Sequence, residues 1–327
     1  MRALITGCEG FLGSHLADLL VTKDVEVFGL VFEDTANLEH LDGKVKLVRV
    51  DLRDQARVRP AVECTKPDLV FHLAAQSFVT VSWQNPELTL ATNVMGTFYL
   101  LEALREQGSK ALIEVVSSSA VYGPCSVSEM PLDEGQEFRP TSMYAVSKVT
   151  EDMLAYFYWR VFGLRIVRVR PFNVTGPRKT GDAVSDFARG IVDVEQGRRG
   201  VLEVGNLDSV RDYSDGRDGA EALWLLSRRG EPGKSYHISS GQERSLRSVV
   251  HELLSMTGID VPVEVSSSKL RPHDDPIYVG DPSRLRELGW EPRIPFAQTL
   301  ADTLQYWREA GDRRGNGPES ERGQASW

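Results

Sequence analysis

Three evenly spaced glycines stand near the start of the chain, directly after a short apolar run. Residues 3–6 form a predicted β-strand, Gly7, Gly10 and Gly13 follow it, and residues 13–20 have a helical pattern. In a strand–turn–helix unit of this kind the glycines permit a tight turn, close approach to a ligand and close helix–strand packing. The N–H groups that begin the helix can then bind a phosphate. The alternative is an ordinary turn that binds nothing.

The first half of the chain alternates short β-branched runs with amphipathic segments. The predicted strands are residues 3–6, 25–31, 45–50, 69–73, 111–117 and 165–170, and predicted helices include 13–20, 86–106 and 144–162. This alternation is typical of βαβ units. It predicts an α/β fold with a Rossmann-type, doubly wound parallel sheet. The alternation breaks near residues 170–173, where a smaller C-terminal region begins.

The composition argues against several kinds of partner and environment. The chain has 327 residues, of which 41% are hydrophobic, and 38 basic against 47 acidic residues give a net charge of −9. This charge disfavours nucleic acid and anionic membranes. The start of the sequence has no signal-peptide pattern, and no apolar run is long enough to span a bilayer. Three cysteines without C-x-x-C spacing suggest neither a disulfide framework nor a metal site. We expect a cytoplasmic protein.

The glycine loop and the ends of the next strands predict a dinucleotide site. Glu33 and Asp34 follow the second strand, and carboxylates there hydrogen-bond ribose hydroxyls but repel a 2′-phosphate. NAD(H) is therefore favoured over NADP(H), unless these two acids form only a solvated loop. The predicted contacts are Gly7, Gly10, Phe11, Leu12, Gly13, Glu33, Asp34, Asp51, Leu52, Leu73, Ala74 and Ala75. His72 is interpreted as a packed core residue.

Tyr144 and Lys148 form a candidate catalytic pair. They lie four residues apart on a predicted helix, so both side chains project from one face. A nearby ammonium favours the phenolate, which would lower the pKa of the Tyr144 phenol from about 10 and make it a usable acid and base. Two ordinary surface residues are the alternative. Ser118 and Ser119 follow the fifth strand, at the sheet edge where ligands of such folds bind.

Together these motifs resemble the extended short-chain dehydrogenase/reductase superfamily, also called NAD-dependent epimerase/dehydratases. The matching segments are residues 6–13 (TGCEGFLG), 72–75 (HLAA), Asn93, 117–123 (SSSAVYG), 144–148 (YAVSK) and 170–173 (RPFN). The resemblance implies that Ser118 binds the reacting oxygen and that Tyr144 is the acid/base. It also implies that Lys148 contacts the nicotinamide ribose and that Asn93 helps to hold the helix of Tyr144.

The second half of the chain resembles the branch with GDP-mannose 4,6-dehydratases and GDP-4-keto-6-deoxymannose reductases. The segments that carry this are residues 172–178, 184–189, 205–213, 271–274 and 280–283. The resemblance implies a nucleotide-diphosphate sugar as substrate. Arginines suit bidentate contacts with a diphosphate, which favours Arg211 and Arg271 above all. The full predicted set is Ser118, Ser119, Tyr144, Asn173, Arg178, Arg189, Arg211 and Arg271. A surface charge is the alternative for each arginine.

Ala120 stands where the dehydratases of this branch carry a glutamate, two residues after the catalytic hydroxyl. Elimination of water needs groups that take and give protons, and alanine can do neither. Glu129, Asp133 or Glu134 would have to substitute. The sequence thus favours reduction of a GDP-4-keto-6-deoxy-hexose at C4, giving a GDP-rhamnose-type product. An NDP-sugar 4-epimerase with bound NAD remains open, and a non-catalytic NAD-binding protein or a dehydratase is a lesser alternative.

The resemblance also implies an arrangement of domains and subunits. The predicted NAD-binding domain comprises residues 1–172 with 212–240, and the predicted nucleotide-sugar-binding region comprises 173–211 with 241–310. Residues 311–327 are polar and without an apolar period, which predicts a disordered tail. Four consecutive aromatic residues, 156–159, cannot all face one core. Because this superfamily often pairs two helices per subunit, a homodimer is predicted, with internal packing as the alternative.

Overall fold

A seven-stranded parallel sheet forms the centre of the computed structural model, which describes residues 1–32, 34–270 and 275–315. Its strands are β1 (Arg2–Thr6), β2 (Glu26–Val31), β3 (Val45–Arg49), β4 (Leu69–His72), β5 (Leu112–Val116), β6 (Arg165–Pro171) and β11 (Ser235–Ile238). Their order is β11-β6-β5-β4-β1-β2-β3, and every neighbouring pair is parallel. The predicted doubly wound sheet is confirmed, with β11 as a further strand that the apolar pattern did not predict.

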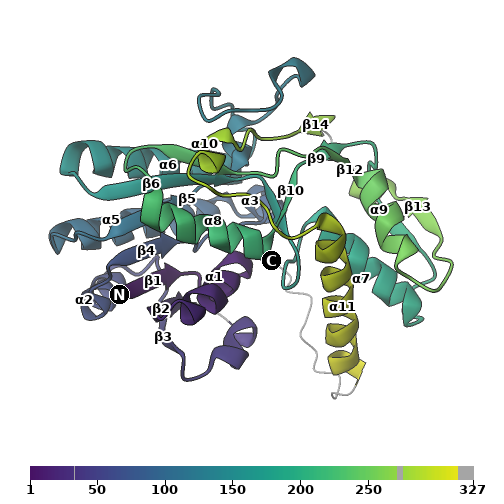
Figure 1. Cartoon of the computed structure of the whole chain (residues 1–327), viewed down its shortest axis with the longest axis horizontal. Helices are drawn as coiled ribbons and strands as arrows, with labels where there is room; N and C mark the ends of the chain where they lie inside the picture. The colour runs from purple at the N-terminus through teal and green to yellow at the C-terminus, as the bar shows by residue number, and fades with distance from the viewer. Residues whose placement is uncertain (33, 271–274, 316–327) are drawn as a thin grey trace.

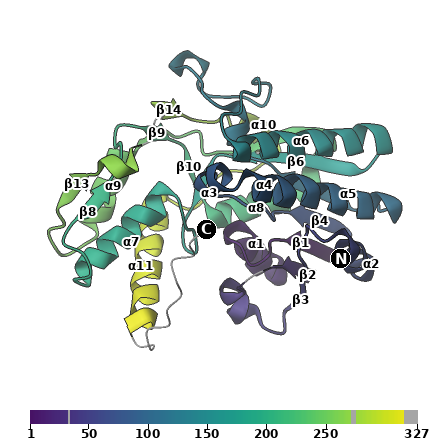
Figure 2. The same cartoon turned by 180° about the vertical axis from the view of Figure 1, so that it is seen from behind.

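Helices cover both faces of this sheet (Figures 1 and 2). On one face α1 (Phe11–Thr22) packs against α8 (Gly216–Arg229) over a core that includes Leu112 and Val116. On the other face α2 (Gln55–Thr65), α5 (Gly96–Glu106) and α6 (Met143–Phe162) cover Ile113 and Val115. Since successive residues of a strand point to opposite faces, a strand buried on both sides is a nearly continuous apolar run, and β5 departs from this only at Glu114.

The predicted helix 86–106 contains a local irregularity. It consists of α4 (Pro86–Leu90), a π-helical turn over Ala91–Met95, and α5. Asn85 caps its start, because the Asn85 side chain accepts a hydrogen bond from the Leu88 N–H. Single π-helical turns inside α-helices are frequent at functional sites. Here the turn contains Asn93, one of the predicted site residues.

A smaller C-terminal region has its own hydrophobic core. It consists of α7 (Ala183–Glu195), α9 (Leu246–Ser255) and α11 (Phe296–Gly315) with the parallel pair β8 (Leu202–Val204) and β13 (Val263–Val265). Figure 1 shows these elements beside the sheet rather than on either face. Helix α11 continues past Gly311 to Gly315, so the predicted disordered tail does not begin at residue 311. Residues 316–327 of that predicted tail lie outside the described residues.

Short elements connect the sheet with this region. They are the parallel pair β7 (Asn173–Thr175) and β10 (Tyr213–Asp215), and a small sheet of β12 (Arg244–Ser245), β9 (Val210–Arg211) and β14 (Ile277–Tyr278). The other helices are α3 (Val79–Gln84), α10 (Ser283–Arg286) and 3-10 turns at Ala36–Leu41, Ser119–Tyr122, Val127–Glu129 and Ser267–Lys269. Across the described segments, none of the helices has the length and apolar character needed to cross a membrane.

Candidate active site

The glycine loop between β1 and α1 is packed too tightly for larger residues. Gly7 has φ +65°, and a Cβ on it would lie 2.7 Å from the Ala74 Cα. A Cβ on Gly13 would lie 2.2 Å from the Gly7 carbonyl oxygen. Gly10 is the N-cap of α1, which has no side-chain cap and no acidic residue in its first turn. An open helix start beside bare backbone fits the diphosphate of a dinucleotide.

The predicted adenosine contacts lie along the ends of β2 and β3, but most have partners within the chain. The Asp34 side chain accepts a hydrogen bond from the Ala36 N–H at 3.0 Å. Asp51 binds the Arg53 guanidinium, and these hydrogen bonds hold the pKa of the Asp51 carboxyl below its usual value. Leu52 is buried beside Gly96. Glu33 lies outside the described residues.

Sequence reasoning missed one acidic residue at this edge. Glu9 lies inside the glycine loop, and its Oε1 accepts the Phe32 N–H at 2.6 Å. Its backbone oxygen accepts a hydrogen bond from Asn37. Glu9 therefore ties the glycine loop to the end of β2, where an adenosine ribose would lie. A charged side chain between two motif glycines was the available signal.

Tyr144 and Lys148 lie on the first turns of α6, which Ser142 caps through a hydrogen bond from the Ala145 N–H. Tyr144 is half-buried, whereas Lys148 is buried. The Lys148 ammonium donates to the Val116 carbonyl at 3.0 Å and to Glu151 at 2.8 Å. Burial acts to lower the pKa of Lys148, but the charges of Glu151 and Tyr144 outweigh it and raise that pKa. Lys148 therefore carries a charge at neutral pH.

The third predicted catalytic residue, Ser118, is the second residue after β5. Its Oγ accepts the Ala120 N–H at 3.1 Å and so caps the 3-10 turn that begins at Ser119. Its neighbour Ser117 donates to the Lys148 carbonyl at 2.9 Å. This bond joins the end of β5 to the start of α6. Ser118 and Lys148 are thus held at one edge of the sheet.

Asn93 holds the helix of the catalytic pair through its side-chain amide. Its Nδ2 donates to the Ser147 Oγ at 2.9 Å and to the Gln76 carbonyl, while its Oδ1 accepts the Gln76 N–H. The π-helical turn thereby connects the loop after β4 with α6. His72 is buried between Thr6 and Thr97, and burial lowers its pKa to about 3. It is a neutral core residue, as the sequence indicated.

A buried ionic network anchors α6 to β6 behind the site. Arg170 forms two bonds with the Asp152 carboxylate, at 2.7 and 3.0 Å, and Arg168 binds the same carboxylate. Arg170 also donates to the Tyr122 hydroxyl, which contacts His237 of β11. The network thus involves the motif 170–173 and the strand that the sequence pattern did not predict.

The predicted substrate residues do not all gather in one place. Arg211 lies on β9, where it donates to the Asp275 carbonyl. Asn173 donates to the Asp212 carbonyl, one residue away from it. Arg178 instead binds Asp18 of α1, and Arg189 is exposed on α7 over the Trp307 ring. Arg271 lies outside the described residues.

Two further residues accompany the predicted substrate set. Ser119 is buried, and its carbonyl accepts a bond from the Tyr278 hydroxyl. Arg244, which the sequence did not single out, pairs with Arg211 across β12 and β9 and stacks over Phe296. Directly opposed residues of an antiparallel pair lie on one face. The two arginines therefore project from one face of this small sheet.

Three comparisons with known proteins are consistent with one another. The family model described as GDP-mannose 4,6 dehydratase matches residues 4–303. A curated relative named GDP-6-deoxy-D-mannose reductase, from Pseudomonas aeruginosa, is 30% identical, covering 94% of this chain and 97% of its own. The chain belongs to the GDP-mannose 4,6 dehydratase family.

Solved structures resemble this family member over nearly its full length. The structure of RMD from Pseudomonas aeruginosa complexed with NADPH has a TM-score of 0.83 and 29% identity, covering 94% of this chain and 99% of the other. The UDP-glucose 4-epimerase of Thermus thermophilus, complexed with NAD, has a TM-score of 0.83 and 31% identity, covering 95% and 100%. The resemblance to extended short-chain dehydrogenase/reductases is confirmed.

The loop after Ala120 offers this member of the GDP-mannose 4,6 dehydratase family no obvious replacement for the missing glutamate. Glu129 binds Ser126, Gln136 and Arg139, and these hydrogen bonds lower its pKa to about 2. Glu134 accepts the His237 N–H and lies beside Arg284. Asp133 accepts the Gly135 N–H of its own turn. Each of these three carboxylates is hydrogen-bonded, either within its own loop or to the backbone of β11.

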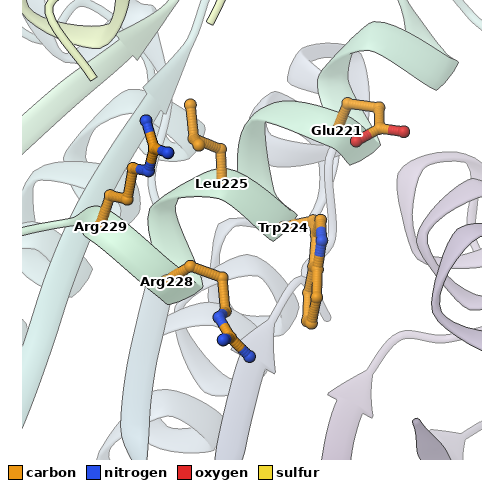
Figure 3. Close-up of a pocket in the computed structure, with 5 residues that line it drawn as sticks. All are labelled: Glu221, Trp224, Leu225, Arg228 and Arg229. Carbon is orange, nitrogen blue, oxygen red and sulfur yellow. The ribbon is translucent and has the colours of Figure 1, made fainter. Parts of the chain in front are cut away.

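A surface hollow on α8 is separate from this site (Figure 3). It is lined by Glu221, Trp224, Leu225, Arg228 and Arg229. Arg228 lies beside Met1, at the end of β1 opposite the glycine loop. Among the residues that the structure describes, no three His, Cys, Asp or Glu side chains gather as metal ligands. The predicted site contains no residue of this hollow.

Proposed function

We propose that this protein reduces the C4 keto group of a GDP-4-keto-6-deoxy-hexose. The observation that carries the proposal is Ala120, beside a loop whose acidic side chains are all engaged elsewhere. Reduction needs a proton donor, a hydrogen bond to the reacting oxygen and a charge that orients the donor. Tyr144, Ser118 and Lys148 supply these three functions. Elimination needs a further acid/base group at position 120.

In this proposal each site residue has a defined task. When bound, the reduced nicotinamide supplies a hydride to C4. Ser118 donates a hydrogen bond to the C4 oxygen, and Tyr144 gives that oxygen its proton. Lys148 holds the nicotinamide ribose with its remaining donor, since an ammonium has three and two of them bind Val116 and Glu151. Arg211, Asn173 and Arg271 bind the nucleotide diphosphate. The relative named GDP-6-deoxy-D-mannose reductase supports this reaction.

The preferred cofactor in the proposal is NAD(H). Glu9 places a carboxylate at the end of β2, and Asp34 is the third residue after that strand. Negative charge there opposes a 2′-phosphate. The domain boundaries proposed are those expected from sequence, with residues 1–172 and 212–240 holding the cofactor. Fluorescence titration with NADH and NADPH tests the preference, and tighter binding of NADPH would contradict it.

A panel of substrates tests the reaction. The protein is incubated with GDP-, UDP- and dTDP-sugars, including their 4-keto-6-deoxy forms, with and without NADH. We expect consumption of NADH only with a 4-keto sugar, and most rapidly with the GDP form. Release of a 4-keto product from GDP-mannose would contradict the proposal, because that reaction is elimination.

A 4-epimerase is the second candidate. The observation that favours it is the likeness to the UDP-glucose 4-epimerase of Thermus thermophilus, at 31% identity over nearly the whole chain. The same Ser118, Tyr144 and Lys148 would serve both reactions. Tightly held NAD in the purified protein, with sugar isomerisation but no net consumption of NADH, would favour this candidate over the reductase.

We propose further that the protein is a homodimer. Exposed apolar side chains form a stripe along α6, at Val146, Met153, Phe157 and Val161. Their spacing of seven, four and four residues places them on one helix face. The same stripe on a second copy of the chain would bury these side chains, because a twofold interface brings one patch against itself. Helix α5 packs beside α6 and would share the interface.

A further inference from the structure

A buried ion pair lies directly behind the catalytic tyrosine. Glu151 follows Lys148 by three residues on α6, and their side chains are 1% and 5% exposed. The Glu151 Oε2 accepts the Lys148 ammonium at 2.8 Å, and its Oε1 is buried without a hydrogen-bond partner. None of the motifs that identify the superfamily in this chain includes Glu151. Within the part of the chain that the structure describes, the Glu151 carboxylate has no hydrogen-bond partner except Lys148.

The other charged and titratable groups around the pair have partners of their own or are neutral. Arg168 and Arg170 of β6 bind Asp152, the residue after Glu151. His72 of β4 is neutral, since burial lowers its pKa to about 3. The π-helical turn contributes the uncharged Asn93. The titratable groups that act on the pair are Tyr144 and Asp152 of α6 and His72 of β4, and Asp152 is itself bound by Arg168 and Arg170 of β6.

We propose that Glu151 offsets the charge of Lys148 and thereby keeps Tyr144 in its protonated, proton-donating form. Glu151 is a positioning residue, because it acts on Tyr144 only through Lys148. The value of this arrangement for reduction rests on the proposed function. The electrostatic coupling itself does not, since it requires only the three side chains of α6.

The sign of the effect follows from the charges. An ammonium within about 4–6 Å of an ionisable group stabilises its anionic form by about 1–3 pKa units. An ionised carboxylate bound to that ammonium removes most of this effect, so the phenol keeps its proton. Burial raises the pKa of Glu151 to about 7, against the pull of Lys148. A protonated tyrosine suits a reductase, because the tyrosine must donate a proton to the C4 oxygen.

A spectroscopic titration tests the coupling without any sugar. The near-ultraviolet absorbance of tyrosinate is recorded against pH in the full-length, NAD⁺-loaded protein and in its Tyr144→Phe variant, and the difference isolates Tyr144. The measurement is repeated with Glu151→Gln and with Glu151→Gln combined with Tyr144→Phe. Glutamine keeps a hydrogen-bond acceptor for Lys148 but removes the charge. We expect the Tyr144 midpoint to fall by about one pH unit or more. An unchanged midpoint would overturn the proposal.

Three further variants make the titration specific. Glu151→Asp keeps the charge and should leave the midpoint nearer to wild type than Glu151→Gln does. Glu151→Leu is a second uncharged variant, for use if Glu151→Gln melts before the titration is complete. Glu231→Gln is the matched control, because Glu231 pairs with Lys234 at the same spacing but on the surface. An equal shift in Glu231→Gln would also overturn the proposal. A negative substrate panel would not affect this measurement, so the two proposals fail separately.

Discussion

Residues at the start of α6 and on β9 carry the proposed chemistry, and each contributes through one functional group. Tyr144 contributes a phenolic oxygen, and Lys148 contributes an ammonium with defined partners at 3.0 and 2.8 Å. Arg211 contributes a guanidinium on the small sheet. Single substitutions can therefore remove one function while leaving the rest of the site in place.

Replacing Tyr144 by phenylalanine removes only the proton donor. We expect turnover of the accepted sugar to fall by about 10²–10⁴, the usual contribution of general acid–base catalysis. The affinity for NADH should stay nearly the same, because the ring and the Lys148 contacts remain. Steady-state rates and a fluorescence titration with NADH measure the two quantities. Unchanged turnover would remove Tyr144 from the mechanism.

Replacing Arg211 by alanine should weaken nucleotide-sugar binding and spare the cofactor. Loss of a hydrogen bond to a charged group, worth about 1.5–3 kcal/mol, corresponds to roughly ten- to a hundred-fold in affinity. Arg189→Ala is the matched control, since Arg189 is exposed over Trp307. Isothermal titration with a GDP-sugar and with NADH separates the effects. Equal losses for both ligands would disprove the assigned role of Arg211.

Among the elements, β5 connects the core with the site. The carbonyl of its last residue, Val116, accepts a hydrogen bond from Lys148, and the serines that follow it begin the candidate active-site loop. Yet the middle of the strand contains Glu114, which is 1% exposed and whose two carboxylate oxygens have no hydrogen-bond partner. Burial raises the pKa of the Glu114 carboxyl well above its usual value of 4.5. The folded protein thus favours a protonated acid in the core.

This buried acid should make stability depend on pH. A raised pKa in the folded state means that ionisation costs stability once the pH exceeds the unfolded value near 4.5. Each further pH unit, up to the folded pKa, costs about 1.4 kcal/mol. Glu114→Gln has no ionisable group at this position and avoids this cost. The melting temperature of the variant minus that of wild type should therefore increase from acid toward neutral pH. Thermal melts of both proteins across that range measure the gain, and parallel curves would refute it.

At the scale of the whole molecule, the described residues bury their apolar side chains in four clusters, while α6 keeps an exposed apolar stripe. Two clusters flank the sheet, a third lies among α7, α9 and α11, and a small fourth surrounds Tyr122 and Phe172. The stripe on α6 includes Phe157 and Val161, which are 45% and 59% exposed. Apolar patches of this kind on a soluble fold commonly mark interaction sites.

Charge introduced into the stripe should separate the proposed dimer. Phe157→Glu combined with Val161→Glu places like charges against each other across a twofold axis, so we expect a monomer in sedimentation at micromolar concentration. Wild type should sediment as a dimer. Ile259→Glu is the control, because Ile259 is similarly exposed but follows α9 in the other region. A monomeric wild-type protein would rule out the homodimer.

Much of the sheet, and the placement of the candidate site residues on its elements, could be predicted from the sequence because the signals are local. Strand periodicity predicted six of the seven strands, and β11 was missed because Ser235 and His237 interrupt its apolar run. Gly7 and Gly13 mark backbone that tolerates no side chain, which is a property of residue type. The spacing of Tyr144 and Lys148 follows from one helix.

The partners of those residues were decided only by the tertiary structure. Arg178 and Arg189 have the charge that a diphosphate needs, but folding sets one against Asp18 and the other over Trp307. Arg244 meets Arg211 only because β12 pairs with β9. Likewise, no motif marked Glu151, whose burial beside Lys148 depends on how α6 packs on the sheet. Residue type determines what a side chain can do, whereas packing of distant segments determines which charge it meets.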